Sequence, residues 1–193
     1  MKKGIVLFFL TAMFFSGCLV TSFHPFYKPA DLVKDNLLPG DWINKNSLLT
    51  FSQLEEGYLL NYRDCEDPHN APNDYSTCTM ADFTVRLMKL GESYYMDFFP
   101  KSYMNSDNLF LNLHVKSTHS LAKVTITKGQ LEFRMLSYAW LTNHLEAGKD
   151  KLSHIKTDDL VTLTATTDEI QAFILKHQNE PGFLDDPIVV NRK

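Results

Sequence analysis

The middle of the chain alternates between apolar and polar residues in a series of short stretches. In the stretch 130–136, for example, Leu131, Phe133 and Met135 fall on one side and the residues between them on the other. A period of two is typical of a β-strand that buries one face, and short links containing glycine or asparagine are typical of antiparallel hairpins. The stretches with this pattern are residues 48–54, 58–64, 78–90, 94–99, 108–115, 121–127 and 130–136.

The spacing changes after residue 136. Apolar residues recur at helical intervals in 137–148 and again in 166–179, where Thr166 and Glu169 have the spacing of a capping box. Residues 159–165 and the last seven residues return to the strand pattern. Together these elements predict a mainly β fold. We expect an antiparallel up-and-down barrel with two or three short α-helices in the C-terminal third, because closure removes the exposed edges of a sheet.

The segment "PGDWIN", residues 39–44, contains Gly40-Asp41-Trp42. It resembles the G-x-W motif that opens the barrel of lipocalins. The resemblance implies a lipocalin-like barrel in which Trp42 lies across the closed end and Arg192, or Lys193, lies over its ring as a cation–π partner. The chain departs from that family through the helix predicted between strands after residue 136. The alternative is that Trp42 is an ordinary core aromatic at the start of the domain.

The first residues have the layout of an export signal. Two lysines follow Met1, an apolar stretch of about a dozen residues comes next, and Ser16 and Gly17 are small. The apolar stretch is shorter than the roughly 20 residues that a membrane-spanning helix needs. The sequence therefore predicts a signal that is removed and not a permanent transmembrane helix.

Phe15-Ser16-Gly17-Cys18 resembles the lipobox of bacterial lipoproteins, with Phe15 where leucine is usual. The resemblance implies cleavage between Gly17 and Cys18, a diacylglycerol on the thiol, and an acyl chain such as palmitate on the new amino group. More than one chain is needed for stable anchoring, because a single chain binds membranes only marginally. Leu19, and not aspartate, follows the cysteine, which implies the outer membrane, facing the periplasm. The alternative is an ordinary signal with a chance cysteine, or cleavage a few residues later.

This interpretation divides the chain into three parts. Residues 1–17 are the signal peptide, residues 18–36 are the lipidated N-terminus and a tether without clear periodicity, and residues 37–193 are one barrel domain. The whole chain has 19 basic and 23 acidic residues, and removal of the signal removes two lysines, so the mature net charge is about −6. With no basic block in the sequence, nucleic acid is not an expected partner.

Cys65 and Cys78 remain once Cys18 carries lipid, and they flank a polar segment that contains two prolines. An exported protein meets an oxidising compartment, which favours a disulfide between them. Closing this loop would contribute about 3 kcal/mol by the chain-entropy estimate. The rival interpretation is a metal site formed by Cys65, His69 and Cys78, but it lacks the paired C-x-x-C spacing of zinc sites.

No catalytic motif accompanies these features. The seven histidines show no H-E-x-x-H pattern, and the chain has neither a G-x-S-x-G elbow nor a phosphate-binding glycine loop. We therefore expect no enzyme activity, no metal site, and no cofactor apart from the covalent lipid on Cys18.

The predicted barrel interior is apolar and aromatic. A barrel of this size either fills its interior with side chains or holds one small ligand. The first outcome describes a structural or assembly lipoprotein that acts through an envelope protein partner. The second describes a lipid-anchored envelope protein that binds a small apolar molecule such as a lipid, a fatty acid or a pigment. A packed core is the commoner outcome, and the residues expected to contact a ligand are Tyr58, Tyr62, Phe83, Met96, Phe98, Leu111 and Phe133.

Overall fold

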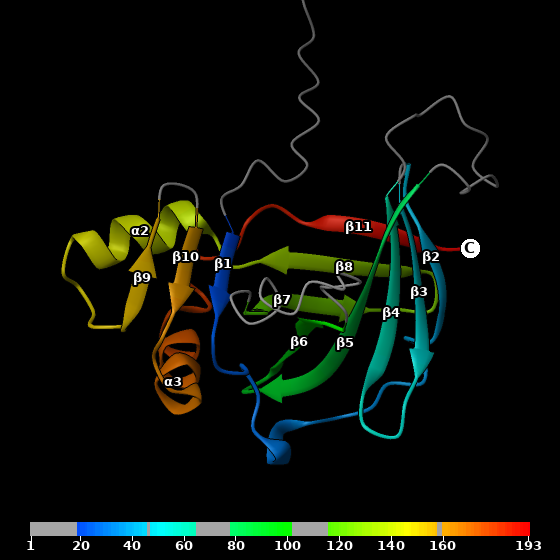
Figure 1. Ribbon diagram of the computed structural model, residues 1–193, viewed down its shortest axis with the longest axis horizontal. Helices are drawn as coiled ribbons and strands as arrows, with labels where there is room; N and C mark the ends of the chain where they lie inside the picture. The colour runs from blue at the N-terminus through cyan, green and yellow to red at the C-terminus, as the bar shows by residue number, and fades with distance from the viewer. Residues whose placement is uncertain (1–18, 46, 65–77, 102–115, 158–159) are drawn as a thin grey trace, which may run out of the picture.

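The computed structural model describes residues 19–45, 47–64, 78–101, 116–157 and 160–193 (Figure 1). The signal and lipid-attachment residues, including Gly17 and Cys18, lie outside this part of the chain. So do Cys65, Leu111 and the strand predicted at 108–115. The predictions that rest on these residues therefore stay predictions.

A closed antiparallel barrel is the main feature of the fold, as predicted from the alternation. Each strand pairs with its neighbour in sequence, and the last strand pairs with both the first and the seventh strands of the barrel, which closes it. The fifth and sixth strands of the barrel also pair directly with each other, as the pair Tyr94 and Val124 shows. The barrel strands are β2 (Gly40–Ile43), β3 (Ser47–Gln53), β4 (Tyr58–Asp64), β5 (Thr79–Leu90), β6 (Ser93–Pro100), β7 (His119–Ile126), β8 (Gln130–Met135) and β11 (Ile188–Arg192).

Tight turns at one end of the barrel set the register of the hairpins. Gly57, between β3 and β4, has φ = +86°, and a Cβ there would lie 2.4 Å from the carbonyl oxygen of Val85. Only glycine fits both the left-handed backbone and this close approach. Leu54 N–H donates to the carbonyl of Gly57 and completes the turn.

This same end is covered by residues 32–38, and we call it the closed end. Leu38 is fully buried in the barrel core, and Val33 N–H donates to the carbonyl of Leu87 at 2.9 Å. The hydroxyl of Tyr58 accepts from the N–H of Asp35 and donates to the carbonyl of the same residue. The opposite end, where β4 and β6 finish and β5 and β7 begin, is the mouth.

The connection between β8 and β11 forms a separate layer beside the barrel (Figure 1). It holds α2 (Tyr138–Glu146), β9 (His154–Lys156), β10 (Leu160–Leu163) and α3 (Thr167–His177). The N-terminal strand β1 (Leu19–Ser22) joins this layer, because it runs parallel to β10 and antiparallel to the start of β7. We call β1, α2, β9, β10 and α3 the flank unit.

Both predicted helices are confirmed, and so are their start signals. Ser137 accepts from Trp140 N–H at the start of α2, and Thr166 and Glu169 form the predicted capping box at the start of α3. The predicted strand at 159–165 also exists as β10, but it belongs to the flank unit and not to the barrel. In the described part of the chain, no helix is long and apolar enough to cross a membrane.

The expected tether at 18–36 is wrong for the described residues 19–36, which are folded onto the domain. Val20 in β1 and Phe26 are buried, and a short 3-10 turn follows at Pro29–Asp31. Phe26 N–H donates to the carboxylate of Asp97 on the outer face of the barrel at 2.9 Å. Four strand residues are too few to show a period, and so the sequence gives no sign of this strand.

Two hydrophobic cores result from this arrangement. The barrel core lies inside the barrel and includes Trp42, Tyr58, Leu60 and Met96. The flank core lies between the flank unit and the outer face of the barrel, and Leu141 is one of its fully buried members.

Candidate functional site: an apolar cavity at the barrel mouth

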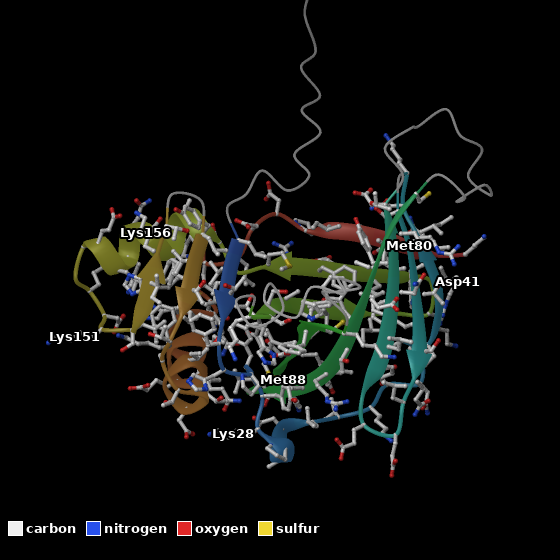
Figure 2. The ribbon with its side chains drawn as sticks, viewed as in Figure 1. Lys28, Asp41, Met80, Met88, Lys151 and Lys156 are labelled. Carbon is white, nitrogen blue, oxygen red and sulfur yellow. The ribbon has the colours of Figure 1, made fainter. Side chains whose placement is uncertain are left out.

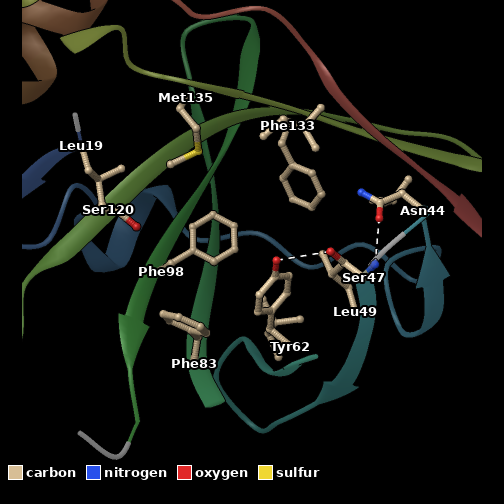
Figure 3. A pocket seen from close by; sticks show the side chains of 13 residues that line it. Leu19, Asn44, Ser47, Leu49, Tyr62, Phe83, Phe98, Ser120, Phe133 and Met135 are labelled. Atoms are coloured by element: carbon tan, nitrogen blue, oxygen red, sulfur yellow. Dashed lines mark hydrogen bonds between the residues drawn. The ribbon is translucent and has the colours of Figure 1, made fainter. Parts of the chain in front are cut away.

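The barrel core is not filled throughout. A cavity of about 220 Å³ occupies the mouth half of the barrel, and side chains from all sides of the barrel point into it (Figure 3). Its lining residues are Leu19, Asn44, Ser47, Leu49, Leu60, Tyr62, Phe83, Phe98, Ser120, Phe133, Met135, Ile188 and Val190.

Strand register brings the apolar lining together. Leu60 pairs directly with Phe83 across β4 and β5, and Ile188 pairs with Phe133 across β11 and β8. Because side chains alternate between the two faces of a strand, residues two apart face the same cavity. The rings of Phe98 and Phe133 lie 6.2 Å apart and form one wall.

A small polar group stands among these apolar side chains. The hydroxyl oxygens of Ser47 and Tyr62 lie 3.3 Å apart, and Ser47 N–H donates to the side-chain carbonyl of Asn44 at 2.9 Å. Burial raises the pKa of Tyr62, so its phenol stays neutral at physiological pH. No lining residue from the described part of the chain carries a charge at that pH. The cavity, as far as the described residues line it, therefore suits an apolar molecule with an uncharged polar group.

The closed end is sealed by the pair that the G-x-W motif predicts. The guanidinium of Arg192 lies over the fully buried ring of Trp42, 4.2 Å from its centroid. It also donates to the carbonyls of Pro39 and Leu37 at 2.7 and 2.5 Å. Gly40 has φ = +122°, and a Cβ there would lie 2.4 Å from a guanidinium nitrogen, so this glycine makes room for the arginine.

The structure separates the residues predicted to contact a ligand into three groups. Tyr62, Phe83, Phe98 and Phe133 line the cavity. Tyr58 and Met96 are fully buried in the filled half of the barrel core and do not line it. Leu111 lies outside the described residues.

Sequence reasoning missed the remaining lining residues for different reasons. Leu60 and Met135 share the inward face of their strands with the predicted Tyr62 and Phe133, so alternation could have found them. Leu19 carries no such signal, because its place at the mouth depends on β1 pairing with strands far away in sequence.

A second cavity, of about 270 Å³, lies on the outer face of β5, β6 and β7. It contains an imidazole–carboxylate pair, since His119 Nδ1 and Asp97 Oδ1 are 2.8 Å apart. The other oxygen of Asp97 accepts from Phe26 N–H, so both oxygens are used in holding residues 23–28 and β7 together. We interpret this pair as structural.

Comparisons of the chain with protein-family models, with curated proteins and with solved structures give no match. The interpretation of the site therefore rests on its own geometry. Cys78 is among the described residues but its predicted disulfide partner Cys65 is not, so that pairing stays a prediction.

Proposed function

We propose that this protein is a lipid-anchored protein of the bacterial cell envelope whose barrel binds a small apolar ligand, such as a fatty acid or the acyl chain of a lipid. The observation that carries the proposal is the apolar cavity of about 220 Å³ at the mouth. An apolar cavity of about 150 Å³ can stay free of water and bind benzene. A larger cavity lined by aromatic and branched side chains favours the binding of hydrocarbon.

The position of the N-terminus links the cavity to the proposed anchor. Leu19 lines the mouth, so a lipid on the residue before it would join the chain close to the cavity opening. Acyl chains on Cys18 would therefore start at the mouth and place it next to the outer membrane, on the periplasmic side. Met80, at the mouth end of β5, is 67% exposed and adds an apolar side chain to this end (Figure 2). A lipid-derived ligand would then reach the cavity from the bilayer.

Ligand binding is tested with the mature protein, purified from membranes and stripped of lipid by organic solvent. A fluorescent fatty acid should bind with a stoichiometry of one per chain. Leu60→Trp fills the cavity and should weaken this binding at least tenfold. The matched control is Leu59→Trp, which places the same bulk on the other face of β4 and should leave binding unchanged.

Anchoring is tested separately by mass spectrometry of the mature N-terminus and by the variant Cys18→Ser. We expect a triacylated Cys18 in the normal protein and an unprocessed or released product for the variant. A variant that stays with membranes at its normal mature size would contradict the anchor. A lipidated protein that binds no fatty acid would instead favour the assembly role with an envelope protein partner.

A further inference from the structure

Three ionisable side chains of the flank unit converge at one point. His144 comes from α2, Asp150 from the loop that follows it, and His177 from the last turn of α3. The Nε2 atoms of both histidines lie 2.8 Å from the same oxygen, Oδ2 of Asp150. Their donor atoms all lie within 4.8 Å of one another, and both imidazoles are buried.

Both ring nitrogens of His177 face carboxylate oxygens. Its Nδ1 lies 2.6 Å from Oε1 of Glu180, and its Nε2 faces Asp150, so each ring nitrogen meets a carboxylate oxygen. A neutral imidazole has only one N–H, and its other nitrogen would then present a lone pair to a lone pair. A metal ion on Nε2 would satisfy both ring nitrogens, since Nδ1–H would then donate to Glu180.

The surrounding groups match the needs of a metal ion. Lys176 Nζ contacts Oδ1 of Asp150 at 2.6 Å, which leaves Oδ2 to the histidines. Glu180 holds His177 through Nδ1 and so directs Nε2 inward, which is the usual role of a carboxylate behind a metal-binding histidine. Zinc–nitrogen distances of about 2.0–2.1 Å put tetrahedral ligand atoms roughly 3.3 Å apart, so the 2.8 Å contacts would widen by about 0.5 Å.

Aromatic side chains hold the two imidazoles in place. The ring of Trp140 stacks on His144 at 4.4 Å with an interplanar angle of 17°, and Phe173 packs against His177 at 4.6 Å. These contacts cover the faces of the imidazoles, while the side chain of Asp150 keeps 22% of its surface exposed. An ion would enter past Asp150.

We propose that His144, Asp150 and His177 bind one divalent transition-metal ion, with Zn²⁺ as the best match. Two imidazole nitrogens and one carboxylate oxygen are ligands that Zn²⁺ accepts, with water in the fourth position. The ion ties the end of α2 to the end of α3. This site is independent of the barrel cavity and of the lipid anchor, because it shares no residue with either.

The first test titrates Zn²⁺ into the full mature protein, purified without a metal-binding tag and dialysed against EDTA. Calorimetry should show one ion per chain with a Kd in the micromolar range or below, and Zn²⁺ should raise the melting temperature. His144→Gln should weaken binding at least tenfold, and Glu180→Gln roughly tenfold or more, as for other residues behind a metal ligand. The matched control is His154→Gln, an exposed histidine of the same unit that lies outside the cluster.

A second measurement needs no variant. Co²⁺ bound in place of Zn²⁺ should give the visible absorption of a four-coordinate nitrogen–oxygen site. A thiolate-to-metal charge-transfer band would place the ion at Cys65 and Cys78 and would overturn the proposal. So would the absence of binding at 100-fold excess of Zn²⁺, or binding that His154→Gln weakens and His144→Gln does not.

Discussion

The barrel core and the flank core lie on the two faces of β5, β6 and β7 and differ in filling and in charge. In β5, Leu87 points into the barrel core and the next residue, Met88, points into the flank core, and both are buried. The barrel core is apolar, and the half of it next to the mouth contains the cavity. Charged side chains, among them Asp150 and Lys176, gather at the edge of the flank core.

The charges at that edge influence one another strongly. The contact with Lys176, followed by the contact with His144, holds the pKa of the Asp150 carboxyl well below its usual range. The mouth cavity has no such groups. The difference teaches that the two faces of one sheet can have different roles: the inner face encloses an apolar cavity, and the outer face packs against the flank unit that carries the polar cluster.

The largest expected effect comes from emptying the filled half of the barrel core. Trp42→Ala removes a fully buried indole at the closed end and should cost about 3–5 kcal/mol in the free energy of unfolding. Urea unfolding followed by circular dichroism measures the loss. Arg192→Ala removes only the cation over the ring and its hydrogen bonds, and should cost less, about 1–2 kcal/mol. An unchanged melting temperature for Arg192→Ala would refute the pairing.

A matched pair of leucines compares the two cores directly. Leu141→Ala in the flank core should cost close to the upper end of the usual 2–5 kcal/mol, because every side of this side chain has packing partners. Leu60→Ala should fall near the lower end, because one side of Leu60 faces the existing cavity. Urea unfolding of both variants in lipid-free protein tests this order. Equal losses would mean that the cavity closes when the protein is empty.

Alkaline pH should lower the free energy of unfolding by ionising a tyrosine in the flank core. Tyr95 is fully buried there and its hydroxyl donates to Gln178 at 3.0 Å, and burial raises its pKa to about 12. A raised folded-state pKa gives stability that is complete below pH 10 and is lost as the pH rises through 12. The loss should be about 2 kcal/mol over this range, measured by urea unfolding at several pH values. Tyr95→Phe should abolish this step, and a step that persists in the variant belongs to another group.

The smallest effect concerns a helix cap of the flank unit. Thr166 accepts from Glu169 N–H at the start of α3, so Thr166→Ala should cost about 1 kcal/mol. Thr166→Ser keeps the oxygen and should lose only a few tenths of that amount. Thermal unfolding distinguishes the two variants, and a similar loss in both would assign the effect to the methyl group of threonine.

Local patterns predicted both helices and every barrel strand except β2, because each of these patterns repeats within a few residues. β5 and β8 alternate cleanly, and the capping box of α3 spans four residues. The place of β10 outside the barrel was not predictable, because its partner β1 lies about 140 residues away and is too short to show a pattern.

The candidate sites were harder to predict than the strands. Alternation shows that Phe83 and Phe133 point inward, but it does not report whether the enclosed volume is full, so the cavity could not be predicted from it. His144 and His177 are 33 positions apart and belong to no linear metal motif. Only the packing of α2 against α3 brings them together.

The register of the first and last strands has a consequence for the order of folding. β1 finds its partners only at residues 119–120 and 160–163, and the ring is sealed by Arg192 beside the last residue. A chain that emerges from the ribosome N-terminus first must leave β1 without its β10 partner until residue 163 has been made. Pairings over such long separations form slowly. The closed barrel can therefore form only after β11, the strand that pairs with both β2 and β8, is available.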